Sequence, residues 1–411
     1  MFGIEGIASP EVVNILGVES GFAYFTWQRL VMWLLGGALI YLGIARKWEP
    51  LLLVPIGMGM ILVQIPLSYH VMGFQMPDGT MLDYLPPTWP ELLEEGGRPI
   101  GFLARIFQYG FGWELIPLFM FLGIGAMTDF TPTIARPIYL ILGAAAQFGV
   151  YAAYFFALLL GFSITEACSI GIIGGADGPT TVYTTQMLAP GLLGATAIAA
   201  YTYMAMVPII QPPVIRAITT EEERKIYMEP RLREVSKLEQ ILFPIIVMIV
   251  TGLFVPAALP IIGCFMIGNL LRVSGVTDRL ARSMSGVFID VVTVFLGVCV
   301  GAYVAAPAFI QPQPLMVFGL GIVAFAFSTF GGVLLAKIMN LFLKTKINPM
   351  IGAAGVSAVP MAARVVQVMG AEADPMNVLL PHAMGPNTAG VIGTAIAAGA
   401  FISLAGPLAG L

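Results

Sequence analysis

Long apolar runs separated by short polar connections make up most of the chain. Ten of these runs contain at most one charged residue each, and they lie at 24–45, 50–67, 106–127, 137–161, 191–213, 241–256, 259–271, 287–306, 315–336 and 377–409. A helix of about 20 apolar residues crosses the hydrocarbon core of a bilayer. The pattern therefore predicts about ten membrane-spanning helices.

The composition agrees with a protein that lies within a membrane. Apolar residues make up 58% of the chain and charged residues only 10%, whereas a soluble domain has roughly 25% charged residues. No segment is polar enough to form a soluble catalytic domain. We therefore predict an all-α polytopic protein of the cytoplasmic membrane, whose chemistry takes place in or beside the bilayer.

The few cysteines and histidines argue against several kinds of site. Cys168, Cys264 and Cys299 lie in apolar surroundings without a Cys-x-x-Cys spacing, so no disulfide framework, iron-sulfur cluster or thiolate zinc site is expected. His70 and His382 belong to no HExxH pattern. The formal net charge of -4 without a basic tract argues against nucleic acid as a partner.

Basic residues near the ends of the spans predict the orientation of the chain. Cytoplasmic loops carry an excess of Lys and Arg. The connection 68–99 contains five acidic residues and a single basic residue, Arg98, as expected of an external loop. With the N-terminus outside, one cytoplasmic side collects Arg46, Lys47, Arg136, the loop 216–240, Arg272, Arg279, Arg282, Lys337, Lys344 and Lys346.

Two further apolar segments, 166–187 and 348–366, are interrupted by Gly, Pro and polar residues, which is typical of broken or re-entrant helices. Both contain an IGxxGxxxxP frame, which begins at Ile170 and at Ile351. The pentamer TAIAA also occurs twice, at 196–200 and 394–398. Short Gly- and Ala-rich strings can match by chance in an apolar chain.

The repeated strings nevertheless fall at corresponding places in two five-span halves of opposite orientation. We predict an N-terminal repeat (1–215), a cytoplasmic loop (216–240) and a C-terminal repeat (241–411), each repeat with one broken segment. This inverted arrangement is that of secondary transporters, in which ions bind near the midplane where the broken helices meet.

The first broken segment places Asp177 between Gly and Pro residues, with no basic residue nearby in sequence. A charged carboxylate deep in a membrane costs on the order of 3 kcal/mol on insertion scales. It therefore needs a cation, a buried arginine or a proton as partner. Unwound backbone carbonyls around Gly174, Gly175 and Gly178 would offer the oxygen ligands that suit Na⁺. The alternative is an exposed turn capped by Asp177, which the surrounding apolar residues disfavour.

The second broken segment opens with Asn348 and contains Ser357 and Arg364, the only Lys or Arg beyond Lys346. An arginine offers a planar fork for a carboxylate. Arg364 either neutralises Asp177 or binds an anionic substrate that enters from the cytoplasm. Both readings stay open at this point.

Three more polar side chains lie within predicted spans near the broken segments. Asn387 supplies an oxygen donor in the last span, in a stretch unwound by Gly and Pro. Tyr201 and Tyr203 lie in the middle of the run 191–213, where each offers a phenol. Tyrosines in membrane helices more often anchor the interface, but these two are far from the ends of their run.

Several long strings resemble signature stretches of one family, the membrane-bound β-subunits of the sodium-pumping biotin-dependent decarboxylases, which act on oxaloacetate, methylmalonyl-CoA or glutaconyl-CoA. The resemblance runs from about residue 25 to about residue 400. It is carried by KWEPLLLVPIG, FLGIGAMTDF, GIIGGADGPTTVY, AAYTYMAMVPIIQPP, KINPMIGAAGVSAVPMAARV and HAMGPNTAGVIGTAIAAG.

The resemblance implies a membrane subunit that decarboxylates carboxybiotin and couples the reaction to Na⁺ export. Its partners would be a carboxyltransferase subunit, a biotin carrier and a small single-span γ/δ-type subunit, in an oligomeric membrane complex. The carrier would supply carboxybiotin in trans, so Na⁺ is the expected ion and this chain would hold no tightly bound organic cofactor. The acid that is decarboxylated would be chosen by the carboxyltransferase.

The resemblance also assigns roles to seven residues, each present in its expected motif. Asp177, Asn348, Asn387 and the unwound backbone near Gly352 would bind Na⁺. Tyr203 and Ser357 would form a second Na⁺ or proton position, with Tyr203 either a proton donor or only a ligand. Arg364 would hold carboxybiotin, and Asn387 would be a second cofactor-binding residue. Arg364, Tyr203 and Ser357 would thus be the catalytic residues.

Two readings from other classes compete with the decarboxylase. The first is an Na⁺- or H⁺-coupled secondary transporter of a small carboxylate, which would use the same inverted repeats, bind its substrate at Arg364 and work without soluble subunits. The second is a membrane scaffold without turnover, which leaves the cost of burying Asp177 unexplained.

Overall fold

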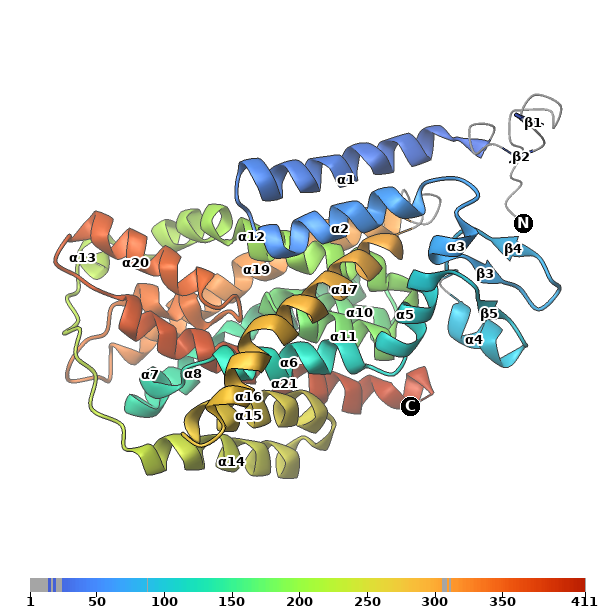
Figure 1. Cartoon of the computed structure of the whole chain (residues 1–411). Coiled ribbons are helices and arrows are strands. Elements are labelled where there is room, and N and C mark those ends of the chain that lie inside the picture. Colours follow the sequence, from blue (N-terminus) through green and yellow to red (C-terminus); the bar gives the residue numbers. More distant parts are fainter. Residues whose placement is uncertain are drawn as a thin grey trace. The chain divides into compact units, whose positions relative to one another are not determined.

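The computed structural model describes residues 14–15, 18–19, 24–86, 88–304, 309 and 312–410 of the chain (Figure 1). The predicted external N-terminus lies outside these residues. Within them, nearly all regular structure is helical, which confirms the all-α class. The only strands are β1 (Asn14–Ile15), β2 (Val18–Glu19), β3 (Phe74–Gln75), β4 (Met81–Leu82) and β5 (Arg98–Pro99).

Among the described residues, eight helical stretches are long and apolar enough to cross a membrane. They are α1 (Trp27–Ala45), α8 and α9 together (Ile138–Leu159), η4 with α12 (Pro190–Ile218), α14 (Lys237–Phe254), η5 with α15 (Pro256–Val273), α16 to α17 (Asp278–Ala302), α19 (Pro312–Met339) and α21 (Leu380–Ala409). A ninth is the pair α5 (Phe102–Gly110) and α6 (Leu115–Met127), which is bent by 66°.

The run 50–67 is the one predicted span that forms a shorter helix. Its helix α2 (Pro50–Val63) has 14 residues, about 21 Å at 1.5 Å per residue, which is less than the hydrocarbon core of a bilayer. The side chain of Gln64, directly after α2, donates to Val304 O at 2.7 Å. The apolar run therefore continues past the residue at which the helix ends.

Several helices begin where the sequence supplies a capping box, a Ser or Thr followed three residues later by Glu. The hydroxyl and the glutamate then satisfy backbone N–H groups that the first helical turn leaves free. The boxes are Ser163 with Glu166 at α10 (Ile164–Ile172), Thr220 with Glu223 at α13 (Glu221–Arg224), and Ser236 with Glu239 at α14.

The chain divides into two compact units. The first comprises Met1–Leu115 and Thr293–Pro314, and the second comprises Ile116–Val292 and Leu315–Leu411. The predicted division into repeats concerns topology rather than compactness, and it stays a prediction.

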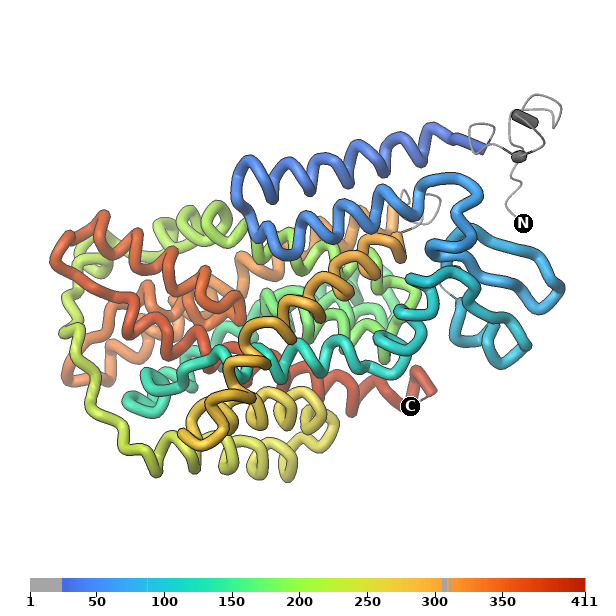
Figure 2. Tube along the Cα trace, viewed as in Figure 1, coloured from blue at the N-terminus to red at the C-terminus, as the bar shows by residue number. Residues whose placement is uncertain are grey.

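In the first unit, α1 and α2 form a hairpin, the blue pair in Figure 2, which packs so closely that a Cβ at Gly36 would lie 2.9 Å from Gly57 O. Arg29 of α1 pairs with Asp83 at 2.8 Å. The predicted external loop contains this aspartate and a three-stranded antiparallel sheet of order β4-β3-β5. The short helices α3 (Tyr69–Met72) and α4 (Trp89–Glu94) complete the loop.

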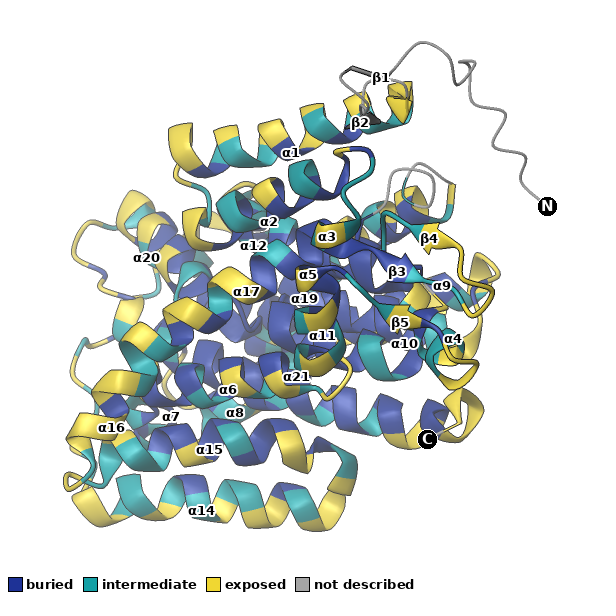
Figure 3. Cartoon of the chain, turned by 45° about the vertical axis from the view of Figure 1, so that its right-hand side comes forward, coloured by how far each residue is buried: buried dark blue, intermediate teal, exposed yellow. Residues whose placement is uncertain are grey.

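The second unit holds both predicted broken segments. Its central helix α21 packs against α8 (Ile138–Ala146), α10, α11 (Gly178–Leu188) and α20 (Met361–Ala373). Every residue from Ala167 to Thr185 is buried, and so is every residue from Ile347 to Ala358. Figure 3 shows α10 and α11 as largely buried segments. Both broken segments are therefore enclosed by protein, which is where a membrane protein tolerates irregular backbone.

One helix crossing occurs twice, once in each unit. In the first unit, a Cβ at Gly59 would lie 2.1 Å from Val298 O, and one at Gly301 would lie 2.0 Å from Ile56 O. In the second unit, a Cβ at Gly268 would lie 2.0 Å from Leu122 O, and one at Gly125 would lie 2.0 Å from Phe265 O. In both crossings, the glycine of each helix therefore lies three residues after the residue whose carbonyl oxygen faces the glycine of the other helix.

A side-chain amide closes each of these crossings. Gln64 donates to Val304 O at 2.7 Å, and Asn269 donates to Thr128 O at 2.8 Å. Each crossing joins the second helix of one predicted repeat to the third helix of the other. This correspondence supports an internal duplication, although the repeat boundaries stay a prediction.

We expect Gly268→Val to lower the free energy of unfolding by about 3 kcal/mol, since its added Cβ would lie 2.0 Å from a backbone oxygen that cannot move aside. Gly263→Val on the same helix is the matched control, because a Cβ there meets nothing within 4 Å. Thermal unfolding of the purified protein in detergent measures both. Equal losses in the two variants would contradict a close crossing at Gly268.

Candidate ion site

The first broken segment is interrupted between α10 and α11, as predicted. Helix α10 passes into the 3-10 turn η3 (Ile173–Gly175), and Ala176 then adopts a left-handed conformation with φ 53°. Asp177 caps α11, and its Oδ1 accepts a hydrogen bond of 3.0 Å from the Thr180 backbone N–H. Pro179 lies in the first turn of α11, where the absence of its N–H costs nothing.

Asp177 lies between two helix ends and is only 5% exposed. The N-terminus of α11 presents N–H groups to the carboxylate, whereas the C-terminus of α10 directs its last carbonyls toward the same break. Within the described part of the chain, no Lys, Arg or His forms an ion pair with Asp177. The break thus combines a buried negative charge with backbone oxygens and lacks a protein cation.

The second broken segment is also irregular, as predicted. It consists of the 3-10 helix η7 (Pro349–Gly355), an extended stretch from Val356, and α20. Gly352 permits its close approach to α19, because a Cβ there would lie 2.1 Å from Gly332 O. A larger side chain at Gly352 would separate the two backbones.

The two broken segments meet at Gly175 and Ser357. The Ser357 N–H donates to Gly175 O at 2.8 Å, and the Ser357 hydroxyl lies 2.6 Å from that of Thr394 on α21. A Cβ at Gly175 would lie 2.5 Å from Thr394 Cγ2. Main-chain atoms of both segments and a threonine of α21 therefore share one small volume beside Asp177.

Asn387 of α21 fixes the second segment at this crossing. Its amide nitrogen donates to Ala354 O at 3.0 Å and to Val356 O at 2.7 Å, on both sides of the point where η7 ends. Its carbonyl oxygen Oδ1 is buried and has no hydrogen-bond partner among the described residues. Because a buried acceptor without a partner is costly, this oxygen is available to a ligand.

Asn348 makes its contacts elsewhere. Its amide nitrogen donates to Arg224 O at 2.8 Å and to Ile226 O at 3.0 Å, and its oxygen accepts from the Met350 N–H at 3.1 Å. These partners belong to the loop 216–240 and to η7, and none belongs to the first broken segment. Asn348 thus anchors the loop, and its role as a Na⁺ ligand stays a prediction.

The two tyrosines of α12 (Leu193–Ile218) have different environments. The Tyr203 hydroxyl donates to Phe318 O of α19, and its ring packs on Gly321. Tyr201 instead packs on Gly178, next to Asp177, and in the described part of the chain its buried hydroxyl has no partner. The hydrogen bonds of Tyr203 and Ser357 lead to different helices, so no described contact joins these two predicted partners.

Arg364 projects from α20 and is exposed. It forms no ion pair with Asp177, which contradicts the reading in which the two residues neutralise each other. The reading in which Arg364 binds an anion stays open, since the guanidinium is free to meet one from solvent.

Some residues of this region were missed because single threonines and glutamines in apolar runs carry little pattern of their own. Thr394 contacts Ser357, Gln147 accepts from Thr394 at 3.2 Å, and Ser328 donates to Gly174 O at 2.6 Å. The four threonines of GPTTVYTT and the repeated TAIAA, which contains Thr394, were the available signals.

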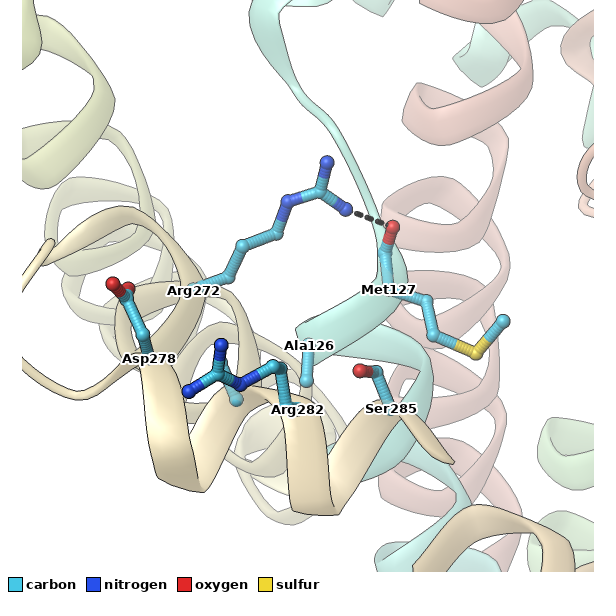
Figure 4. Close-up of a pocket in the computed structure, with 7 residues that line it drawn as sticks. Ala126, Met127, Arg272, Asp278, Arg282 and Ser285 are labelled. Atoms are coloured by element: carbon cyan, nitrogen blue, oxygen red, sulfur yellow. Dashed lines mark hydrogen bonds between the residues drawn. The ribbon is translucent and has the colours of Figure 1, made fainter. Parts of the chain in front are cut away.

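A separate pocket of about 500 Å³ lies between the C-terminal ends of α6 and α15 (Leu259–Val273) and the length of α16 (Asp278–Ser283) (Figure 4). Arg272, whose guanidinium donates to Met127 O, lines it together with Asp278 and Arg282. None of the predicted site residues lines this pocket.

Comparison with known proteins identifies the family. The chain matches the family described as Na⁺-transporting oxaloacetate decarboxylase beta subunit over residues 28–405. It is 47% identical to the oxaloacetate decarboxylase beta chain of Haemophilus ducreyi, over 93% of this chain and 96% of the relative. It is 49% identical to the methylmalonyl-CoA decarboxylase subunit beta of Propionigenium modestum, over 94% and 98%. The chain therefore belongs to the family of beta subunits of Na⁺-transporting decarboxylases.

Proposed function

We propose that this membrane subunit decarboxylates carboxybiotin, which a biotinylated carrier brings to its cytoplasmic face, and uses the reaction to export Na⁺. The observation that carries the proposal is the buried Asp177 at the meeting of two broken segments, where none of the described Lys, Arg or His residues forms an ion pair with it. A carboxylate in that position is stabilised by binding a monovalent cation, which neutralises its charge.

For the ion, we propose a site made of Asp177, the unpartnered Oδ1 of Asn387 and unwound backbone oxygens of the two segments. Asn348 and Gly352 shape the second segment, one through the loop 216–240 and the other through its close contact with α19. Tyr203 and Ser357 are proposed as a second Na⁺ or proton position, each held by its own hydrogen bond.

For the reaction, the N–CO₂⁻ bond of carboxybiotin breaks, CO₂ leaves, and the ureido nitrogen takes up a proton. Arg364 would bind the carboxylate of carboxybiotin. Moving this carboxylate from water into a protein pocket lowers the barrier to decarboxylation, because the carboxylate loses hydration. The proton would come from Tyr203 or from water by way of it. Proton uptake and Na⁺ release would then be coupled through the charge near Asp177.

We expect Arg364→Ala to raise the carrier concentration needed for half-maximal decarboxylation by about tenfold, because an ion pair with the carboxylate is lost. The exposed Arg364 contacts none of the residues around Asp177, so stabilisation by Na⁺ should be unchanged. Steady-state kinetics and thermal unfolding in NaCl measure the two effects. A variant with unchanged kinetics would exclude Arg364 from carboxybiotin binding.

The partners we propose are a carboxyltransferase subunit, a biotin carrier and a single-span γ/δ-type subunit, with the N-terminus of this chain outside. The loop 216–240 offers an ordered cytoplasmic surface for the carrier. Besides Asn348, the Asn377 amide holds this loop by donating to Ile226 O at 2.8 Å. His382 also contacts this loop, since its Nε2 lies 2.7 Å from Glu229 O. Because a carbonyl oxygen can only accept, Nε2 of the neutral imidazole donates to it, and Nδ1 then accepts from the Tyr139 hydroxyl.

Na⁺ uptake into proteoliposomes that contain this chain with its copurified partners tests the function. Uptake should depend on the decarboxylation substrate and stop when avidin blocks biotin. Uptake that is indifferent to avidin would instead favour a secondary transporter of a small carboxylate, and the proposal would be wrong.

A further inference from the structure

We infer that the hydroxyls of Thr180 and Tyr201, here called the hydroxyl cluster, complete a dehydrated monovalent-cation site around Asp177. The inference rests on the proposed binding of Na⁺ at Asp177. It adds two ligands that the sequence did not assign, and it makes Tyr201 rather than Tyr203 the phenol nearest to the ion.

The first argument is the absence of hydrogen bonds. Both residues are 0% exposed, and within the described part of the chain their hydroxyl oxygens have no partner. A buried hydroxyl normally finds a partner, and one without a partner carries the cost of its lost hydration. Two such groups next to one buried carboxylate indicate a missing ligand that both of them contact.

The second argument is their position around Asp177. The residue three positions after Asp177 falls on its side of α11, because an α-helix has 3.6 residues per turn. Thr180 therefore lies on the face that starts at the carboxylate. An ideal Cβ at Gly178 would lie 2.5 Å from Cζ of Tyr201, the atom that bears the hydroxyl. Gly178 thus allows the phenol to reach the same place.

The two neighbouring threonines of α11 provide an internal comparison. The Thr181 hydroxyl donates to Asp177 O at 2.7 Å, and Thr185 accepts from the Thr196 hydroxyl at 3.2 Å. Both of these threonines are therefore satisfied by protein atoms, and Thr181, four residues after Asp177, lies on the same side of the helix as Asp177. A hydroxyl without a partner is thus not a general feature of threonines in this buried helix.

The charge of the site selects the kind of ligand. An anion is excluded by Asp177. No cluster of three His, Cys, Asp or Glu side chains that could hold a metal ion occurs among the described residues, and a single carboxylate balances one positive charge. Hydroxyl, carboxylate and carbonyl oxygens are hard ligands, which suits Na⁺.

The test is thermal unfolding of the purified complex in NaCl and in choline chloride at equal ionic strength, without carrier substrate. Tyr201→Phe and Thr180→Val should each raise the Na⁺ concentration for half-maximal stabilisation about tenfold, because each removes one ligand of the ion. In choline chloride these variants should unfold at the wild-type temperature or above it, since each removes a buried hydroxyl without a partner.

Two controls separate the cluster from general effects. Thr180→Ser retains the oxygen, so it should respond to Na⁺ within about twofold of the wild type. Tyr151→Phe removes a phenol from a side chain that is 42% exposed and should change nothing.

Three outcomes decide the inference. Phe and Val variants that respond to Na⁺ like the wild type, while Asp177→Asn does not, would overturn the hydroxyl cluster and leave the proposed function intact. Asp177→Asn that responds like the wild type would overturn both. Phe and Val variants that unfold below the wild type in choline chloride and keep their Na⁺ response would show that the hydroxyls are purely structural.

Discussion

We expect Asp177→Asn to abolish Na⁺ transport while leaving the protein folded. Asparagine is as good an N-cap as aspartate, so its side-chain oxygen still accepts the hydrogen bond from the Thr180 N–H that is 3.0 Å long in the wild type. The substitution removes only the charge. Because that charge offsets the cost of stripping water from Na⁺, we expect uptake to fall at least about 100-fold.

Proteoliposome uptake and thermal unfolding measure the two sides of this prediction. In Na⁺-free buffer the variant should unfold at or above the wild-type temperature, since a buried neutral amide costs less than a buried charge. Asp129→Asn is the matched control, because this exposed aspartate caps the Thr131 N–H in the same way at 2.9 Å. Transport by Asp177→Asn at the wild-type rate would contradict an ion site at this residue.

Asn387→Ala has the second largest expected effect, on stability as well as on Na⁺ dependence. The change leaves Ala354 O and Val356 O without their donor and removes the Oδ1 that we assign to the ion. A buried carbonyl without a partner costs about 1–3 kcal/mol, so we expect the free energy of unfolding to fall by about 3 kcal/mol. Stabilisation by Na⁺ should be lost.

Asn340→Ala distinguishes loss of a hydrogen bond from loss of the ion site. The Asn340 side chain bonds the N–H and the carbonyl of Ile347, each at 2.8 Å, outside the crossing of the two broken segments. This variant should be less stable than the wild type but retain its response to Na⁺. An Asn387→Ala protein that keeps the wild-type Na⁺ response would show that Asn387 is only a clamp.

The membrane architecture was predictable because it follows from local composition. Apolar runs and their interruption by Gly and Pro act over a few residues, so the spans and both broken segments were located from sequence. The early end of α2 was not predictable, because Gln64 bonds Val304, a residue far away in the chain. The apolar residues after it gave no sign of this contact.

The composition of the candidate site was predictable only in part. Asp177, Ser357 and Asn387 stood out as polar groups in apolar surroundings, and all three lie at or beside the crossing of the broken segments. The choice between Tyr201 and Tyr203 depends on which side of α12 faces Gly178, and that is settled by packing. The exposure of Arg364 likewise depends on how α20 lies on its neighbours, which one sequence does not reveal.

Equilibrium binding of radioactive Na⁺ to the purified protein, without carrier or substrate, tests the ion site at Asp177 most directly. Wild type should bind Na⁺ saturably, and Asp177→Asn should show no saturable binding under the same conditions. Saturable binding of equal affinity in both proteins would contradict the assignment of Asp177 and of the crossing around it as the Na⁺ site.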